Sequence, residues 1–202
     1  MLLLLLRGVT PWARVLLLST LAFAAQHDPV SVCAVLDNPT EFRGKTVAVT
    51  GILYGNRHHG WYILDNVATT PCDRLATLGV DLSPVIRLDG YFKDSDIEGG
   101  GVDFETDQDS ERRMFELQAT TEKKPELRLV VTVLGLLRTQ GTFEIKRLAG
   151  GGYLGSGYGP GGQAPAQLVI KTVVRKVVVP KDRADSQVAA WAGRTLKTPS
   201  PR

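Results

Sequence analysis

The sequence of 202 residues lacks the residue sets that most catalytic and metal-dependent proteins require. It has two cysteines without C-x-x-C spacing and only three histidines, which does not match the usual Cys/His patterns of zinc sites. No serine stands in a G-x-S-x-G motif, and no acid–base or nucleophile set can be assembled. Residues 157–162 formally match G-x-G-x-x-G, but a strand rather than a helix is expected to follow them. We therefore expect a protein that is not an enzyme and needs no cofactor.

A long uninterrupted apolar run is missing as well. Residues 1–25 instead combine two arginines with a short apolar run, and they end near an A-x-A site at residues 22–24. This pattern is typical of a cleavable secretory signal peptide. It predicts a periplasmic or secreted protein whose mature chain, starting near residue 26, has no stable membrane span. An uncleaved anchor is the alternative, although the run is short for a bilayer.

A strong excess of charge is also absent, since the net charge of +3 falls to +1 without the two arginines of residues 1–25. Export and this weak charge make nucleic acid an unexpected partner. The charges are segregated, however. Residues 94–111 carry eight acidic and no basic side chains, whereas residues 171–202 are mostly basic. Solvated faces and a basic, flexible tail at residues 181–202 are the simplest interpretation.

The clearest pattern present is a strand, a polar turn and a second strand over residues 45–65. β-branched residues dominate the first strand, and aromatic residues begin the second. Ala48 and Ile52 place apolar groups on the second face of the first strand, which indicates that its outer face is partly covered. Gly51 inside that strand predicts a bend or a close backbone approach.

The remaining segments predict a mainly β fold. Proline follows a short helical pattern at residues 28–38, and acids in the first turn favour a second helix that Asp107 or Asp109 caps. The order matches a five-stranded OB-like Greek-key barrel over residues 26–180, with an N-terminal short helix and one helix between strands 3 and 4. The expected elements are helix 28–38, strands 46–53, 61–64 and 85–92, helix 107–121, and strands 127–137, 143–146 and 167–179; residues 67–83, 93–105 and 150–166 are expected loops, and a short helix is expected near 186–191.

Cys33 and Cys72 flank the first hairpin. In an exported chain an even pair of cysteines favours a disulfide. Such a bridge would close a loop of about 40 residues and contribute roughly 3–4 kcal/mol by the loop-entropy estimate. A redox or metal pair is the alternative, but the spacing does not favour it.

The run C-A-V-L-D-N-P-T-E-F-R-G-K-T-V-A-V-T-G at residues 33–51 resembles the opening of small exported bacterial proteins of unknown function with an OB-fold-like, nucleic-acid-binding-type fold. Those proteins share a cysteine in a short helix, an N-P pair and then G-K-x-V-x-V-x-G. Cys72, residues 131–135 and residues 155–170 match their second cysteine, their later V-x-V-x-G strand and their glycine-rich loop before a final L-V-I strand. The resemblance covers about residues 30–179 and implies an OB-like barrel. The acidic loop has no counterpart in it.

OB barrels bind ligands on one face through aromatic and basic side chains. We expect a non-catalytic binding module of the cell envelope whose partner is a glycan, a small anion or another protein. Aromatic core or cross-strand pairs are the alternative role for the same residues. The candidate ligand-binding residues are Tyr54, Arg57, Trp61, Tyr62, Arg87 and Tyr91.

The acidic loop matches the D-x-D-x-[D/N]-G-x5-E spacing of a calcium loop, with a glutamate in the third position. Two features argue against Ca²⁺, because the loop follows a strand and Gly101 replaces the usual aliphatic residue. A solvated loop is the alternative. A second function class follows from this segment: a structural or interaction domain that acts through the acidic loop and the basic tail. The candidate calcium ligands are Asp94, Asp96, Glu98 and Glu105.

Overall fold

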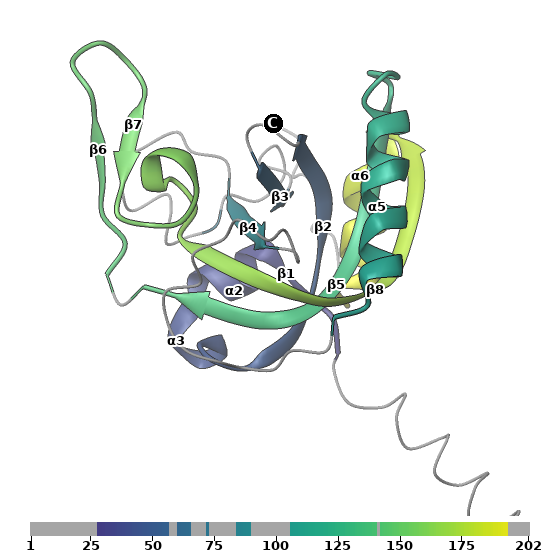
Figure 1. Ribbon diagram of the computed structural model, residues 1–202, viewed down its shortest axis with the longest axis horizontal. Helices are drawn as coiled ribbons and strands as arrows, with labels where there is room; N and C mark the ends of the chain where they lie inside the picture. The colour runs from purple at the N-terminus through teal and green to yellow at the C-terminus, as the bar shows by residue number, and fades with distance from the viewer. Residues whose placement is uncertain are drawn as a thin grey trace, which may run out of the picture.

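The computed structural model describes residues 28–56, 60–65, 72, 84–89, 106–140 and 142–193. The fold is mainly β, with a mixed sheet of six strands in a partly ring-like arrangement (Figure 1). The strand order is β1-β2-β3-β4-β8-β5, and a further pairing of β2 with β5 joins the two ends of a five-strand ring. The strands are β1 (Val30–Ser31), β2 (Thr46–Asn56), β3 (Gly60–Leu64), β4 (Val85–Asp89), β5 (Leu127–Thr139) and β8 (Ala166–Pro180).

Strand β2 belongs to both sides of the ring because it changes partner along its length. Residues 46–52 pair with β5, and residues 52–56 pair with β3. Gly51 lies at this change, where a Cβ atom would collide with the side chain of Ile63 and the carbonyl oxygen of Leu64. The close backbone approach predicted for Gly51 is therefore confirmed.

Strands β5 and β8 form a long antiparallel ribbon whose register shifts twice, once beside Gly135. A Cβ atom on Gly135 would collide with the carbonyl oxygen of Val169. Such irregularities bend a strand, and here they let β5 reach β2 on its other edge. The strands predicted at residues 127–137 and 167–179 are confirmed, each slightly longer than expected.

The main hydrophobic core lies inside the ring. Burial alternates strictly along β3 and β4, so that one residue points inward and the next points outward. Trp61, Ile63, Ile86 and Leu88 are therefore buried, together with apolar residues of β2, β5 and β8. The same alternation places Tyr62 and Arg87 on the outer face, which matters for the candidate site.

Two short helices, α2 (Val32–Asp37) and α3 (Pro39–Phe42), precede the ring. The backbone N–H of Ala34 donates to Oγ of Ser31, which caps α2 at 3.1 Å. The helix predicted from residue 28 begins only at Val32, because Val30 and Ser31 pair with β2 instead. Cys33 forms the predicted disulfide with Cys72, with their Cα atoms 5.0 Å apart.

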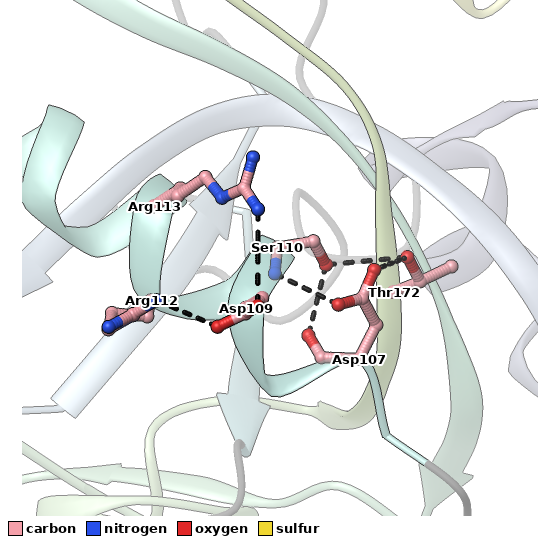
Figure 2. A network of polar contacts seen from close by, with 6 residues as sticks. All are labelled: Asp107, Asp109, Ser110, Arg112, Arg113 and Thr172. Atoms are coloured by element: carbon pink, nitrogen blue, oxygen red, sulfur yellow. Dashed lines mark hydrogen bonds and ion pairs between the residues drawn. The ribbon is translucent and has the colours of Figure 1, made fainter.

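Helix α5 (Gln108–Thr121) follows the predicted position, and the predicted cap by Asp107 is confirmed. The backbone N–H of Ser110 donates to the Asp107 carboxylate at 3.0 Å. Figure 2 shows that Thr172 of β8 joins this cap: its hydroxyl donates to the same carboxylate at 3.2 Å. The backbone N–H of Val173 donates to Oγ of Ser110. These bonds attach the start of α5 to β8.

The folded chain continues past residue 180 as η3 (Lys181–Arg183) and α6 (Ala184–Trp191). Helix α6 covers the outer face of β2 and β5, where Ala184 and Val188 pack against Ile52 and Val130. Residues 181–193 of the expected flexible tail at 181–202 are instead part of the fold, because α6 buries an apolar patch on the outer face of the sheet. The partly covered outer face that Ile52 predicted is confirmed. No helix in the described ranges is long and apolar enough to cross a membrane.

The segment between β5 and β8 is more structured than the predicted loop. Strand β6 (Ile145–Arg147) pairs with β7 (Tyr153–Gly155), and this hairpin projects away from the ring (Figure 1). The short strand predicted at residues 143–146 thus does not join the main sheet. The loop predicted at 150–166 contains β7 and a turn, η2 (Pro160–Gly162). Positive φ angles at Gly151 and Gly152 reverse the chain between the two strands.

Candidate functional site

Five outward-facing side chains lie next to one another across the ring, and we call them the polar row. Residues directly opposite each other on paired strands share a face of the sheet, so the row follows from the register alone. It begins with two tyrosines and continues with two arginines on either side of a glutamine. In spatial order the polar row is Tyr54 (β2), Tyr62 (β3), Arg87 (β4), Gln167 (β8) and Arg138 (β5).

A hollow of about 560 Å³ lies at the β4, β8 and β5 end of this row. We call it the polar hollow, because charged and hydrogen-bonding groups make up much of its lining. Two of these groups, Gln167 and Arg138, are also members of the polar row. Arg43 enters from the turn after α3, and Tyr158 from the segment between β7 and η2. Charged and hydrogen-bonding side chains of the lining include Arg43, Asp89, Arg138, Tyr158 and Gln167.

Asp89 is the acidic group of the polar hollow. Nε2 of Gln167 donates a hydrogen bond to its carboxylate at 3.0 Å. Burial raises the pKa of Asp89 above its usual range, although the charges of Arg87 and Arg138 act in the opposite direction. The carboxylate is thus partly shielded from water, and two arginines act on it.

Two phenols flank the same region. Burial raises the pKa of Tyr62, partly offset by the charge of Arg87. Burial also raises the pKa of Tyr158, partly offset by the charges of Arg138 and Arg43. Both hydroxyl groups therefore stay protonated at neutral pH and can both donate and accept hydrogen bonds.

The segment before η2 folds against the polar row at Gly159. A Cβ atom there would lie 2.9 Å from the hydroxyl of Tyr62 and 3.1 Å from a terminal nitrogen of Arg87. Gly159 also has a φ of +82°, a conformation that favours glycine. Nε of Arg87 is buried and has no hydrogen-bond partner among the described residues. A buried donor without a protein partner is uncommon in folded proteins, which makes Arg87 a candidate contact for a ligand or a water molecule.

The structure brings together three of the six predicted ligand-binding residues. Tyr54, Tyr62 and Arg87 share the outer face, and Tyr54 is 61% exposed. Trp61 is corrected: its ring is 7% exposed, belongs to the core and stacks on Phe115 of α5. Adjacent residues of a strand point to opposite faces, so Trp61 and Tyr62 cannot serve one surface. Arg57 and Tyr91 lie outside the described residues.

Sequence reasoning missed most of the polar hollow. Alternation along residues 127–139 could have placed Arg138 on the outer face. Its proximity to Asp89 and Gln167 depends on which strands are neighbours, and that information is not local. Arg43 and Tyr158 come from turns, for which no periodic pattern exists.

The predicted calcium ligands Asp94, Asp96, Glu98 and Glu105 all lie outside the described residues. Within the described ranges, no three His, Cys, Asp or Glu side chains form a group that could hold a metal ion. The calcium hypothesis therefore remains a prediction from sequence spacing.

Comparisons with family models, with curated proteins and with solved structures find no match to this chain.

Proposed function

We propose that this protein is an exported, non-catalytic binding module that takes a cell-envelope ligand on the polar row and in the polar hollow. The observation that carries the proposal is their continuity: aromatic, cationic and amide side chains from five strands lead directly into a hollow of about 560 Å³. Ligand sites usually combine concave shape with a few converging polar groups.

The strand order supports an OB-like barrel as the framework. The ring runs β2-β3-β4-β8-β5 and returns to β2, with β4 and β8 parallel and α5 between β4 and β5 in the chain. We infer that β3 and β4 are the second and third strands of such a barrel. OB barrels bind oligonucleotides and oligosaccharides on that face and on the adjoining loops. The resemblance of residues 33–51 to exported OB-like proteins agrees with this inference.

Export is supported by the disulfide and by the signal-peptide pattern of residues 1–25. Disulfides persist in oxidising compartments such as the periplasm. An exported binding module meets glycans and envelope components rather than nucleic acid, which makes a carbohydrate ligand the first to test.

A glycan array probed with the labelled full chain tests the proposal. We expect the wild-type protein to bind a subset of glycans. Tyr62→Ala and Gln167→Ala should each bind about tenfold more weakly, since each variant loses a hydrogen-bonding group at the site. Arg112→Gln on α5 is the control, because that side chain is exposed, lies outside the polar row and the polar hollow, and pairs with Asp109 of the same helix. Equal binding by the control and the two site variants would contradict the proposed surface, as would the absence of any bound glycan.

A further inference from the structure

Positive charge exceeds negative charge around the polar hollow. Arg43 and Arg138 line it, and Arg87 stands beside Gln167 in the neighbouring strand. Asp89 is the one acidic residue among the described residues of the lining. The charges of Arg87 and Arg138 act on this carboxylate, and the charge of Arg43 acts on Tyr158 in the same lining. Three arginines against one aspartate leave a surplus of positive charge at the hollow.

The one carboxylate is already engaged by a neutral group. Nε2 of Gln167 donates to Asp89 at 3.0 Å, which fixes both side chains in the lining of the hollow. Asp89 is half-buried, so water is partly excluded there. Charge interactions are stronger and less screened by salt in such a setting than on an open surface. An anionic ligand entering from solvent would thus be attracted by the surplus positive charge of the arginines.

Neutral hydrogen-bonding groups surround the same arginines. The phenol of Tyr158 lines the hollow, and the phenol of Tyr62 lies beside Arg87 in the polar row. Phenols and amides bond to ligand hydroxyl groups as donors and as acceptors. Tyrosine rings also provide apolar faces for a flat ligand. The volume of about 560 Å³ lies in the range of small-molecule sites and exceeds what a bare ion fills.

We propose that the polar hollow binds an anionic group, a carboxylate or a phosphate, carried on a hydroxyl-rich scaffold such as an acidic sugar. The inference rests on the proposed function and adds the chemical class of the ligand. Arg43, Arg87 and Arg138 hold the anionic group, since guanidinium matches the two oxygens of a carboxylate or phosphate. The phenols and Gln167 hold the hydroxyl groups of the scaffold.

Calorimetric titration with matched probes tests the ligand class. The first pair is tetragalacturonate and its full methyl ester, which keeps the scaffold and removes the charge. The second pair is glucose 1-phosphate and glucose, and inorganic phosphate is added alone as a fifth probe. We expect at least one acidic sugar to bind roughly tenfold or more tightly than its neutral partner, and this preference to shrink as salt rises. The pair that shows the preference identifies carboxylate or phosphate as the source.

Variants locate the effect at the hollow. Arg43→Gln and Arg138→Gln should each reduce affinity for the preferred probe at least tenfold, whereas Arg112→Gln should not change it. Arg43 sits on a turn, so its variant keeps the test valid if replacement of Arg138 within β5 disturbs folding. Thermal unfolding of each variant checks this.

The outcomes distinguish failure of the anionic ligand class from failure of the proposed binding function. Equal affinity for charged and neutral partners, with loss on Tyr62→Ala, would overturn the anionic ligand and leave the binding surface standing. Binding of inorganic phosphate without either acidic sugar would show a simple ion site and overturn the hydroxyl-rich scaffold. No binding of any of the five probes, together with an empty glycan array, would overturn both the ligand class and the proposed function.

Discussion

The ring of Trp61 stacks on the ring of Phe115, with centroids 4.5 Å apart and planes 21° from parallel. Trp61 belongs to β3 and Phe115 to α5, so the contact fastens the helix between β4 and β5 onto the first hairpin. With its ring turned inward, Trp61 leaves the outer face of β3 to its neighbour Tyr62. The interior of the ring thereby determines which aromatic residue the candidate site can use.

The stacked pair should stabilise the fold measurably. We expect Trp61→Leu to destabilise the protein by about 1–3 kcal/mol through lost volume. A double-mutant cycle with Phe115→Leu should give a coupling energy of about 0.5–1.5 kcal/mol, the usual value for an aromatic pair. Urea unfolding measures both quantities. Tyr54→Leu, at an exposed position of β2, should stay within about 0.5 kcal/mol of wild type. Strictly additive effects of the two core changes would contradict a direct interaction.

The disulfide should make a larger contribution. Cys33 and Cys72 are 39 residues apart in sequence, and closing a loop of that length in the unfolded chain contributes about 4 kcal/mol in the entropy model. We expect the Cys33→Ser, Cys72→Ser double variant to lose about that much unfolding free energy. The wild-type protein should lose it on reduction as well. A loss below about 1 kcal/mol would contradict the entropy model for this loop.

Two aspartates should give opposite pH effects. Burial raises the pKa of Asp89 above its ordinary 3.8, so its stabilising contribution is complete below pH 3.8 and is lost as pH rises through the folded value. Hydrogen bonds, first that from the backbone of Ser110, lower the pKa of Asp107. Its contribution is present above pH 3.8 and is lost as pH falls through the folded value. For each variant, Asp89→Asn and Asp107→Asn, the free energy of unfolding is subtracted from that of wild type at a series of acidic pH values. The two differences should change with pH in opposite directions. Slopes of equal sign would be inconsistent with these environments.

Helix α6 should be needed for stability rather than act as a tail. Val188 is 1% exposed and covers Ile52 and Val130. An aspartate in its place would bury an unpaired charge, so Val188→Asp should cost about 3 kcal/mol or more. Ala190→Asp, on the exposed face of the same helix, is the matched control and should cost about 1 kcal/mol or less. Chemical denaturation compares them, and equal, small effects would mean that α6 does not hold the outer face.

Local sequence patterns predicted the mainly β fold, the hairpin and helix α5 because each depends on residues close together in the chain. Gly51 and the Asp107 cap are examples, since a glycine inside a strand and an acid before a helix have local causes. Export, the leader and the full OB-like assignment remain predictions that rest on pattern and resemblance.

The features that could not be predicted from the sequence depend on contacts between segments far apart in the chain. Arg87 and Arg138 are 51 positions apart in sequence. They lie on either side of Gln167 because β8 pairs with both of their strands. The short helix expected near residues 186–191 is present as α6, but its packing role depends on an apolar patch around Ile52 on a strand that is distant in sequence. A short strand was predicted at residues 143–146, close to β6, but β7 and its pairing with β6 were missed because strands of three residues are too short for a periodic signal.

The central claim is that the outer face formed by β3, β4 and β8 binds the ligand, and amide chemical-shift mapping tests it most directly. The isotope-labelled full chain with its disulfide intact would be titrated with tetragalacturonate. We predict that the largest shift changes fall on Tyr62, Arg87, Tyr158 and Gln167 and saturate with a single affinity. Largest changes on α5 or α6, or no changes with millimolar tetragalacturonate and none with millimolar glucose 1-phosphate, would contradict the account.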